Sequence, residues 1–145
     1  MKPMQVVIPM SGSGQRFRQA GYSLPKPLLD VAGKPLIERQ LEQYPRDWKF
    51  VFIPSEEQMK TTPLREVLSK LAPGATIAPI PAHKLGPVHT VLAAKDAIQD
   101  DLPTFINYCD FSFSWDAADF ASFAERTRCD GALLCYKGFH AHYLR

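Results

Sequence analysis

The sequence of 145 residues has little of three things: long apolar runs, cysteine, and an excess of charge of one sign. No apolar run approaches the roughly 18 residues that a membrane-spanning helix needs, so no membrane partner is expected. The N-terminus lacks the apolar stretch and the small-residue cleavage site of a secretory signal peptide. The three cysteines, Cys109, Cys129 and Cys135, form no CxxC pair. We therefore expect reduced, mostly buried thiols in a cytoplasmic protein.

Net charge is only +2, and 46% hydrophobic with 22% charged residues is ordinary globular composition. This composition excludes a disordered, collagen-like or coiled-coil chain, and the length predicts one domain over residues 1–145. Residues 1–34 nevertheless carry a net charge of +4, against −2 for residues 35–145. The positive charge surrounds a glycine-rich turn, which indicates a local anion site rather than a broad basic face. No nucleic-acid partner is therefore expected.

Five short apolar runs predict β-strands at residues 5–10, 48–53, 75–80, 104–109 and 131–136. The runs are continuous rather than alternating, which is typical of parallel strands covered on both faces. The intervening segments predict helices at residues 35–44, at 62–71, from 86 onward, and at 115–128. The faces expected to be buried are Val88, Val91, Leu92 and Ile98 on the third helix and Phe120, Phe123 and Ala124 on the fourth. This order predicts an α/β fold with a doubly wound, mostly parallel sheet, in which ligands bind at the carboxyl ends of the strands.

The turn Ser11-Gly12-Ser13-Gly14 follows the first predicted strand. Its two glycines let the backbone approach a ligand closely and turn amide groups inward, as in anion-binding nests. Arg16 comes directly afterwards, and its planar guanidinium fork matches the geometry of a phosphate. The alternative is a tight strand-to-helix turn with solvated arginines. The adjacent arginine and a second basic loop favour the phosphate site.

That second loop places Lys26 between Pro25 and Pro27. Stiff backbone holds the ammonium at low entropic cost, which favours a fixed phosphate contact over a rigid, solvated connector. Asp110 follows the fourth predicted strand, where a carboxylate facing phosphates is well placed to hold Mg²⁺; a cap for the next segment is the alternative. Gly86 begins a helix whose free amides are available to a base or a phosphate, and ordinary helix initiation is the alternative.

Two other nucleotide-binding patterns are missing. The GxxxxGK[ST] run of a Walker A loop does not occur. A dinucleotide-binding turn needs a third glycine, but Phe17 stands at that position after Gly12 and Gly14. It also needs an acidic residue ~20 residues further on, at the end of a second strand, and none is there. A Rossmann dehydrogenase is therefore disfavoured.

Together the motifs resemble the signature of the sugar-phosphate nucleotidylyltransferases, the NDP-sugar pyrophosphorylases. The likeness rests on residues 7–17, 25–29, 33–37, 90–94 and 107–110. It runs in register over nearly the whole chain and is closest to the branch that serves bacterial capsule and surface-polysaccharide synthesis. The resemblance implies a nucleotide-binding fold of the glycosyltransferase-A type.

The resemblance also implies a reaction, in which an NTP and a sugar 1-phosphate give an NDP-sugar and pyrophosphate, with Mg²⁺ as cofactor. By this likeness Arg16 and Lys26 would be catalytic residues that neutralise the phosphates, and Asp110 would bind the metal. The nucleotide-binding residues would be Met10, Ser11, Gly12, Ser13, Gly14 and Gly86.

Two departures from the family leave alternatives open. Leu85 stands where the family often has glutamine before the glycine, and leucine cannot hydrogen-bond to a base edge. The family's catalytic domain also continues beyond the fifth predicted strand, so we expect a fold that is incomplete at its C-terminal side, with the nucleotide half and not the sugar half. Such a chain would bind nucleotide weakly and turn over poorly or not at all, or would be a non-catalytic binding module. Its apolar edge would pair with a second copy, as a homo-oligomer, or stay exposed.

Overall fold

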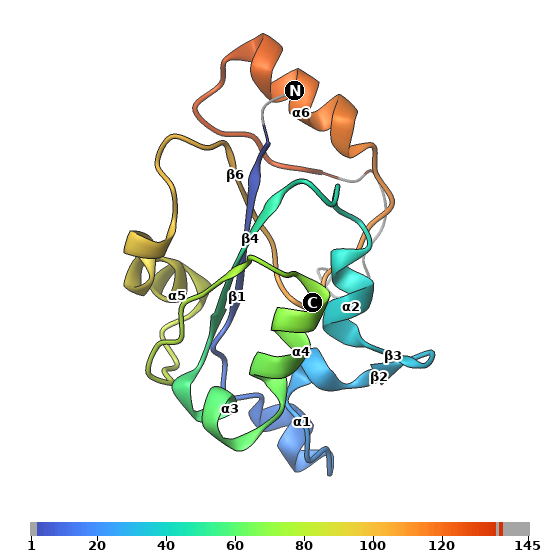
Figure 1. Cartoon of the computed structure of the whole chain (residues 1–145), viewed down its shortest axis with the longest axis vertical. Helices are drawn as coiled ribbons and strands as arrows, with labels where there is room; N and C mark the ends of the chain where they lie inside the picture. Colours follow the sequence, from blue (N-terminus) through green and yellow to red (C-terminus); the bar gives the residue numbers. More distant parts are fainter. Residues whose placement is uncertain (1–2, 136, 138–145) are drawn as a thin grey trace.

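A four-stranded parallel sheet forms the centre of the computed structural model, which describes residues 3–135 and 137. Its strands are β1 (Gln5–Met10), β4 (Lys49–Pro54), β5 (Thr76–Ile77) and β6 (Thr104–Ile106), in the order β5-β4-β1-β6 (Figure 1). β1 is central and pairs in parallel with both β4 and β6. The predicted α/β fold with a mostly parallel sheet is confirmed.

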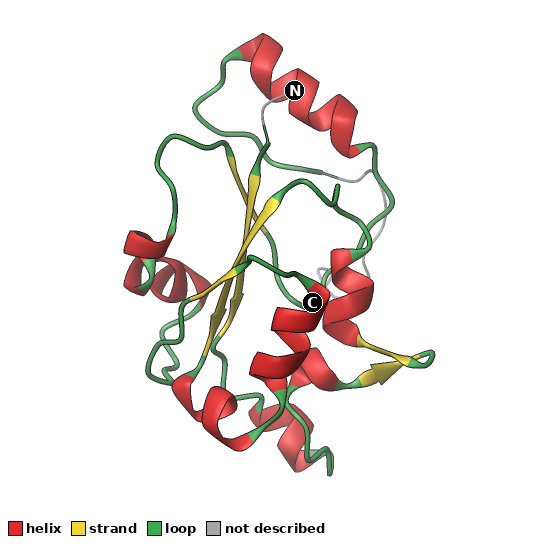
Figure 2. Ribbon diagram, viewed as in Figure 1, coloured by secondary structure: helices red, strands yellow, loops and turns green. Residues whose placement is uncertain are grey.

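Helices cover both faces of this sheet (Figure 2). The α-helices are α1 (Gln15–Gln19), α2 (Leu36–Leu41), α3 (Glu56–Thr61), α4 (Leu64–Leu71), α5 (Pro87–Ala93) and α6 (Ala117–Thr127). Shorter elements are the 3-10 helices η1 (Lys26–Leu28) and η2 (Lys95–Ala97) and an antiparallel hairpin of β2 (Asp30–Val31) and β3 (Lys34–Pro35). The predicted helices at 35–44, 62–71 and 115–128 are thus present with shorter bounds.

β1 is buried along its whole length because its side chains enter apolar clusters on both faces of the sheet. Val6 packs into the larger cluster, together with Ile37 of α2 and Leu68 of α4. Val7 points to the opposite face, into a smaller cluster that Val91 of α5 helps to cover. A strand buried on both faces needs the continuous apolar run found in the sequence. The doubly wound arrangement is therefore confirmed.

The last predicted strand, at residues 131–136, is wrong. The third, at residues 75–80, is confirmed as a segment that pairs with β4. Residues 131–135 form no strand and Leu133 is 90% exposed, while residue 136 lies outside the described residues. An apolar run becomes a strand only where a sheet edge offers backbone partners, and this run joins no ladder. At residues 75–80, by contrast, the amides of Ala78 and Ile80 donate to the carbonyls of Phe52 (2.9 Å) and Pro54 (3.0 Å) beyond the end of β5.

Only part of the face predicted to be buried on α5 and just beyond it is buried: Val91 and Ile98 pack against the smaller apolar cluster as predicted, and two other residues do not. Val88 and Leu92 are 72% and 63% exposed, whereas Thr90 is only 3% exposed. The cause is a pair of polar partners, Ser11 and His83, which hydrogen-bond the Thr90 hydroxyl and turn that side of the helix inward. Sequence periodicity counts apolar residues and does not register such a contact.

Two further burial predictions fail near the end of the described chain. On α6, Phe123 is 42% exposed, although Phe120 packs against the core as expected. Of the cysteines, Cys109 is buried as predicted, but Cys129 and Cys135 are exposed free thiols. Across residues 3–135 and 137, no helix is both long and apolar enough to cross a bilayer.

Candidate functional site

A pocket of about 1040 Å³ lies at the carboxyl end of β1, where the fold class predicts a ligand. It is bounded by the turn after β1, helix α1, the loop before η1, the end of α3, the segment before α5, and the turn after β6. All nine residues predicted for the site line it: Met10, Ser11, Gly12, Ser13, Gly14, Arg16, Lys26, Gly86 and Asp110. The structure thus brings together residues that are up to 100 positions apart.

The glycine turn meets α1 through a residue in the left-handed backbone region. Gly14 has φ 60° and ψ 23°, and it forms the N-cap of the helix. Its carbonyl accepts from the amides of Phe17 (3.0 Å) and Arg18 (3.1 Å). A Cβ at Gly12 or Gly14 would meet no atom within 4 Å, so open space surrounds this backbone. The turn therefore leaves room for a ligand, and Gly14 supplies a conformation that other residues rarely adopt.

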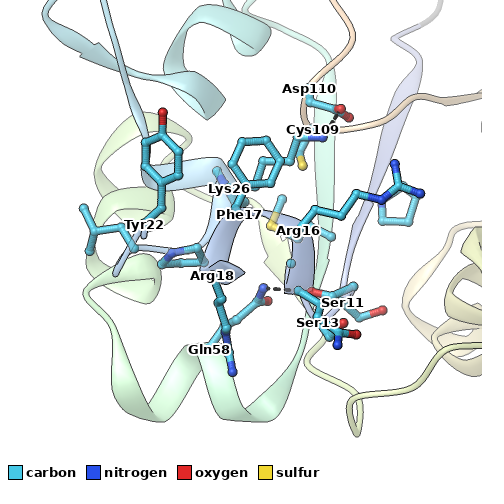
Figure 3. Close-up of a pocket in the computed structure, with 18 of the residues that line it drawn as sticks. Ser11, Ser13, Arg16, Phe17, Arg18, Tyr22, Lys26, Gln58, Cys109 and Asp110 are labelled. Carbon is cyan, nitrogen blue, oxygen red and sulfur yellow. Dashed lines mark hydrogen bonds and ion pairs between the residues drawn. The ribbon is translucent and has the colours of Figure 1, made fainter. Parts of the chain in front are cut away.

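Two arginines of α1, Arg16 and Arg18, line the pocket (Figure 3). They differ in their partners. Arg18 pairs with Glu57 at 3.4 Å, which ties α1 to α3. Arg16 is exposed and makes no side-chain hydrogen bond or ion pair with any described residue. Its guanidinium, with five N–H donors, is therefore available to an anion in the pocket.

Lys26 and Asp110 form an ion pair across the pocket (Figure 3). Both side chains are about one-third exposed, at 32% and 37%. The ammonium of Lys26 also lies 5.2 Å from the centre of the Phe17 ring, within range of a cation–π contact. Pro25 and Pro27 flank the lysine, and Pro27 is buried. The predicted phosphate contact and the predicted metal ligand are thus direct neighbours.

Asn107 holds the turn that presents Asp110. Its amide nitrogen donates to the Tyr44 hydroxyl (2.8 Å) and to the Phe111 carbonyl (3.0 Å), and its oxygen accepts from the amide of Tyr108 (2.9 Å). Burial raises the pKa of Tyr44 to about 12, so its hydroxyl remains protonated at neutral pH. The turn is therefore fixed from both sides by a buried, neutral hydrogen-bond network.

Cys109 lies next to Asp110 but does not offer a nucleophile. Burial, and then the neighbouring Asp110 carboxylate, raise the pKa of this thiol to about 12. A thiol must ionise to react, and this one remains protonated at neutral pH. Its role is packing, because it belongs to the larger apolar cluster.

A divalent metal would find one carboxylate in this pocket. Asp110 is the only acidic residue among those that line it, and the described part of the chain contains no group of three or more His, Cys, Asp or Glu side chains. Mg²⁺ is usually held by one or two carboxylates together with substrate phosphates and waters. The partly exposed Asp110, facing the basic side of the pocket, fits that mode and does not fit a cage built from protein ligands alone.

Gly86 is the N-cap of α5, with φ 87° and ψ 174°, a conformation restricted to glycine. A Cβ there would meet no atom within 4 Å, so the pocket is open on this side. Leu85 beside it is 71% exposed. The segment therefore presents backbone to the pocket at Gly86, while Leu85 is not among the residues that line the pocket.

Sequence reasoning missed three polar residues that shape the pocket. Gln58 donates to the Gly12 carbonyl at 3.4 Å, and it is half of a capping box with Ser55 at the start of α3. A Ser-x-x-Gln pattern after an apolar strand was a usable signal for that helix. His83 and the Thr90 hydroxyl carry no such signal, because their role depends on a contact with Ser11 more than 70 positions away.

The chain matches the MobA-like NTP transferase domain over residues 6–144 and therefore belongs to that family. No curated protein sequence matches it significantly. Among solved structures, it is similar to a UTP-bound UGPase from Acinetobacter baumannii, with a TM-score of 0.65 and 18% identity over 88% of this chain and 54% of that one. It is also similar to a nucleoside-diphosphate-sugar pyrophosphorylase from Vibrio cholerae RC9, with a TM-score of 0.59 and 22% identity over 77% of this chain and 51% of that one.

Identities this low support the shared fold alone. The chain spans about half the length of these solved relatives, at 51% and 54%. The comparisons therefore establish the family and the fold of this chain, and they do not establish its substrates.

Proposed function

We propose that the domain transfers a nucleotidyl group from an NTP to a sugar 1-phosphate, giving an NDP-sugar and pyrophosphate for bacterial polysaccharide synthesis. The observation that carries the proposal is the convergence of Arg16, Lys26 and the glycine turn on one pocket at the end of β1. Membership of an NTP transferase family supports the reaction class, and the similarity to pyrophosphorylases supports the sugar phosphate as acceptor.

In this reaction an oxygen of the sugar phosphate attacks the α-phosphorus of the NTP. A new P–O bond forms, the bond from the α-phosphorus to the bridging oxygen breaks, and pyrophosphate leaves with that oxygen. Catalysis of such transfers depends mainly on positioning and on neutralising charge. The backbone of Gly12 and Gly14 would contact the nucleotide and its phosphates, while Arg16 and Lys26 would neutralise the leaving pyrophosphate.

Asp110 would bind Mg²⁺ together with the phosphate oxygens of the nucleotide. The ion would supply positive charge to the triphosphate. When the nucleotide binds, its phosphates and the Asp110 carboxylate would compete for the single ammonium group of Lys26. Lys26 would then leave Asp110 and pair with a phosphate.

A binding module without turnover is the second candidate. It is favoured by Leu85, whose exposed apolar side chain offers a base no hydrogen bond. The two candidates share the pocket and differ only in whether pyrophosphate is released.

The test compares two exposed arginines, Arg16 in the pocket and Arg46 outside it. Titration calorimetry with UTP, GTP, CTP and ATP in the presence of Mg²⁺ identifies the nucleotide. Arg16→Ala is expected to weaken its binding about 10- to 100-fold, the usual effect of losing a hydrogen bond to a charged group, and Arg46→Ala to leave it unchanged. Equal affinities for Arg16→Ala and the unchanged chain would remove the phosphate assignment.

Pyrophosphate release with a panel of sugar 1-phosphates then separates the two candidates. Release that depends on one sugar 1-phosphate supports transfer. Binding of an NTP with no release for any sugar supports the module.

A further inference from the structure

His83 forms the centre of a small polar cluster on the wall of the pocket. Its Nε2 lies 2.9 Å from Thr90 Oγ1 and 3.3 Å from Ser11 Oγ. The two hydroxyls lie 2.8 Å from one another, and Ser11 and Thr90 are only 1% and 3% exposed. Shielded from water, they hydrogen-bond with each other and with His83, and the Thr90 hydroxyl also reaches the Gly86 carbonyl at 3.4 Å.

The other ring nitrogen of His83 faces the backbone. The backbone amide of Leu85 donates to Nδ1 at 3.1 Å. Nε2 faces the hydroxyls of Thr90 and Ser11. Both ring nitrogens are therefore engaged with the protein, and His83 has no hydrogen-bonding group left for a ligand.

These contacts join two walls of the pocket. One wall is the glycine turn, which begins at Ser11 directly after β1. The other is the segment from His83 to Gly86, which ends at the N-cap of α5. Leu85 and Gly86 are exposed, and two side chains link them to the turn: His83, and Thr90, whose hydroxyl contacts Ser11 and also donates to the Gly86 carbonyl at 3.4 Å. Of these two side chains, the His83 imidazole also accepts from the Leu85 amide, so the position of residues 83–86 relative to the turn depends on it together with Thr90.

We propose that His83 is a positioning residue, which locks the segment at Gly86 in register with the glycine turn so that one nucleotide can contact both. The inference rests on the proposed function for the identity of the ligand. His83 acts through Ser11, Thr90 and the Leu85 amide, and it does not touch the ligand.

Three variants of His83 separate its two contacts. In His83→Asn the side-chain oxygen lies near the place of Nδ1 and can still accept from the Leu85 amide, while the contact with Thr90 is lost. In His83→Gln the amide reaches the place of Nε2 and keeps Thr90, while the contact with Leu85 is lost. His83→Ala loses both. His89→Ala is the matched control, because His89 only touches the His83 ring edge-on at 4.6 Å and makes no hydrogen bond with a described residue.

The first measurement compares the NTP identified by calorimetry with inorganic tripolyphosphate, which needs only the turn and the basic side chains. His83→Ala is expected to weaken NTP binding about 10-fold and tripolyphosphate binding less than 2-fold, while Asn and Gln give intermediate losses for NTP. His89→Ala is expected to bind both as the unchanged chain does. Equal losses for NTP and tripolyphosphate would overturn the proposal, since they would indicate a general loss of structure.

The second measurement needs no ligand. Hydrogen exchange at the Leu85 amide is expected to be slow in the unchanged chain and in His83→Asn, and fast in His83→Ala and His83→Gln. The same exchange rate in all four would overturn the positioning role. If exchange shows this pattern but no NTP binds to the unchanged chain, the proposed function fails while the role of His83 in ordering the segment is supported.

Discussion

The two strands that flank β1 differ in how far they run beside it. β4 pairs with β1 at six consecutive positions, and residues 51–54 are buried. β6 pairs at only three positions, and Ile106 at its end is 55% exposed. Both strands run parallel to β1, so each ends at the same side of the sheet as the pocket.

The segments that leave these two strands differ as well. After β4, Ser55 caps α3 at once, and the backbone is satisfied within the scaffold. After β6, the chain leaves the sheet and places Asn107, Tyr108 and Asp110 in a turn, and the last two of these line the pocket. The longer ladder supports the fold, and the early end of the shorter one leaves polar groups where a ligand can reach them.

The largest contrast is expected from truncating one side chain on each strand. Phe52 on β4 is fully buried, so Phe52→Ala is expected to lower the free energy of unfolding by about 3–5 kcal/mol. Ile106→Ala on β6 is expected to lower it by less than about 1 kcal/mol, because much of the side chain is already in water. Urea titration followed by circular dichroism measures both. Similar losses would show that the β6 side supports the core as strongly as the β4 side.

Two lysines allow a test of the charged groups near the end of β6 that leaves the buried core unchanged. Lys26 pairs with Asp110 in the turn after β6, and Lys34 lies elsewhere. Lys26→Met is expected to weaken NTP binding about 10- to 100-fold, because a hydrogen-bonded charge is lost from the pocket. Lys34→Met is the matched control: Lys34 pairs with Glu38 (2.9 Å) and Glu42 (2.5 Å), away from the pocket. Calorimetry measures the NTP affinity of both variants. Equal losses of affinity for Lys34→Met and Lys26→Met would contradict a specific role for Lys26 in the pocket.

The smallest effect concerns pH and Tyr44, which braces the turn after β6. The folded pKa of Tyr44 is raised to about 12, from an ordinary value of about 10 in the unfolded chain. Its hydroxyl therefore contributes stability that is fully present below pH ~10 and is lost as the pH rises toward 12. The stability advantage of the unchanged chain over Tyr44→Phe is expected to shrink across this window.

Urea titrations at several pH values between 8 and about 11.5 measure that advantage. Tyr22→Phe is the control, because Tyr22 is 50% exposed and makes no side-chain hydrogen bond with a described residue. A constant difference between Tyr44→Phe and the unchanged chain would mean that the hydroxyl titrates equally in the folded and unfolded states.

The central sheet could be predicted from the sequence because strands buried on both faces leave a continuous apolar run. The run at 5–10 matches β1 residue for residue, and the run at 48–53 differs from β4 by one position. The run at 131–136 is also continuously apolar, and residues 131–135 still form no strand. The composition of a segment indicates that it can form a β-strand. It does not indicate whether the sheet has a free edge strand with which that segment can pair.

The nine residues predicted for the site all line the pocket, because short motifs fix them locally, at a glycine turn, a proline-flanked lysine, a strand end and a helix start. Their roles remain predictions. The contacts between motifs could not be predicted in the same way. The ion pair of Lys26 with Asp110 and the cluster around His83 join residues 84 and 72 positions apart, and only the folded chain defines which partners meet.

In the ion pair of Lys26 with Asp110, the positive charge of the ammonium and the negative charge of the carboxylate cancel one another inside the pocket. An anion that takes Lys26 must separate the pair, and it leaves Asp110 as an uncompensated carboxylate in a partly buried place. A cation that binds next finds the Asp110 carboxylate already free of Lys26. Because coupling between two ligands is reciprocal, the cation strengthens anion binding by the same factor. Under the proposed function, the pocket would therefore take opposite charges together, and a cation–nucleotide complex would bind better than either component alone.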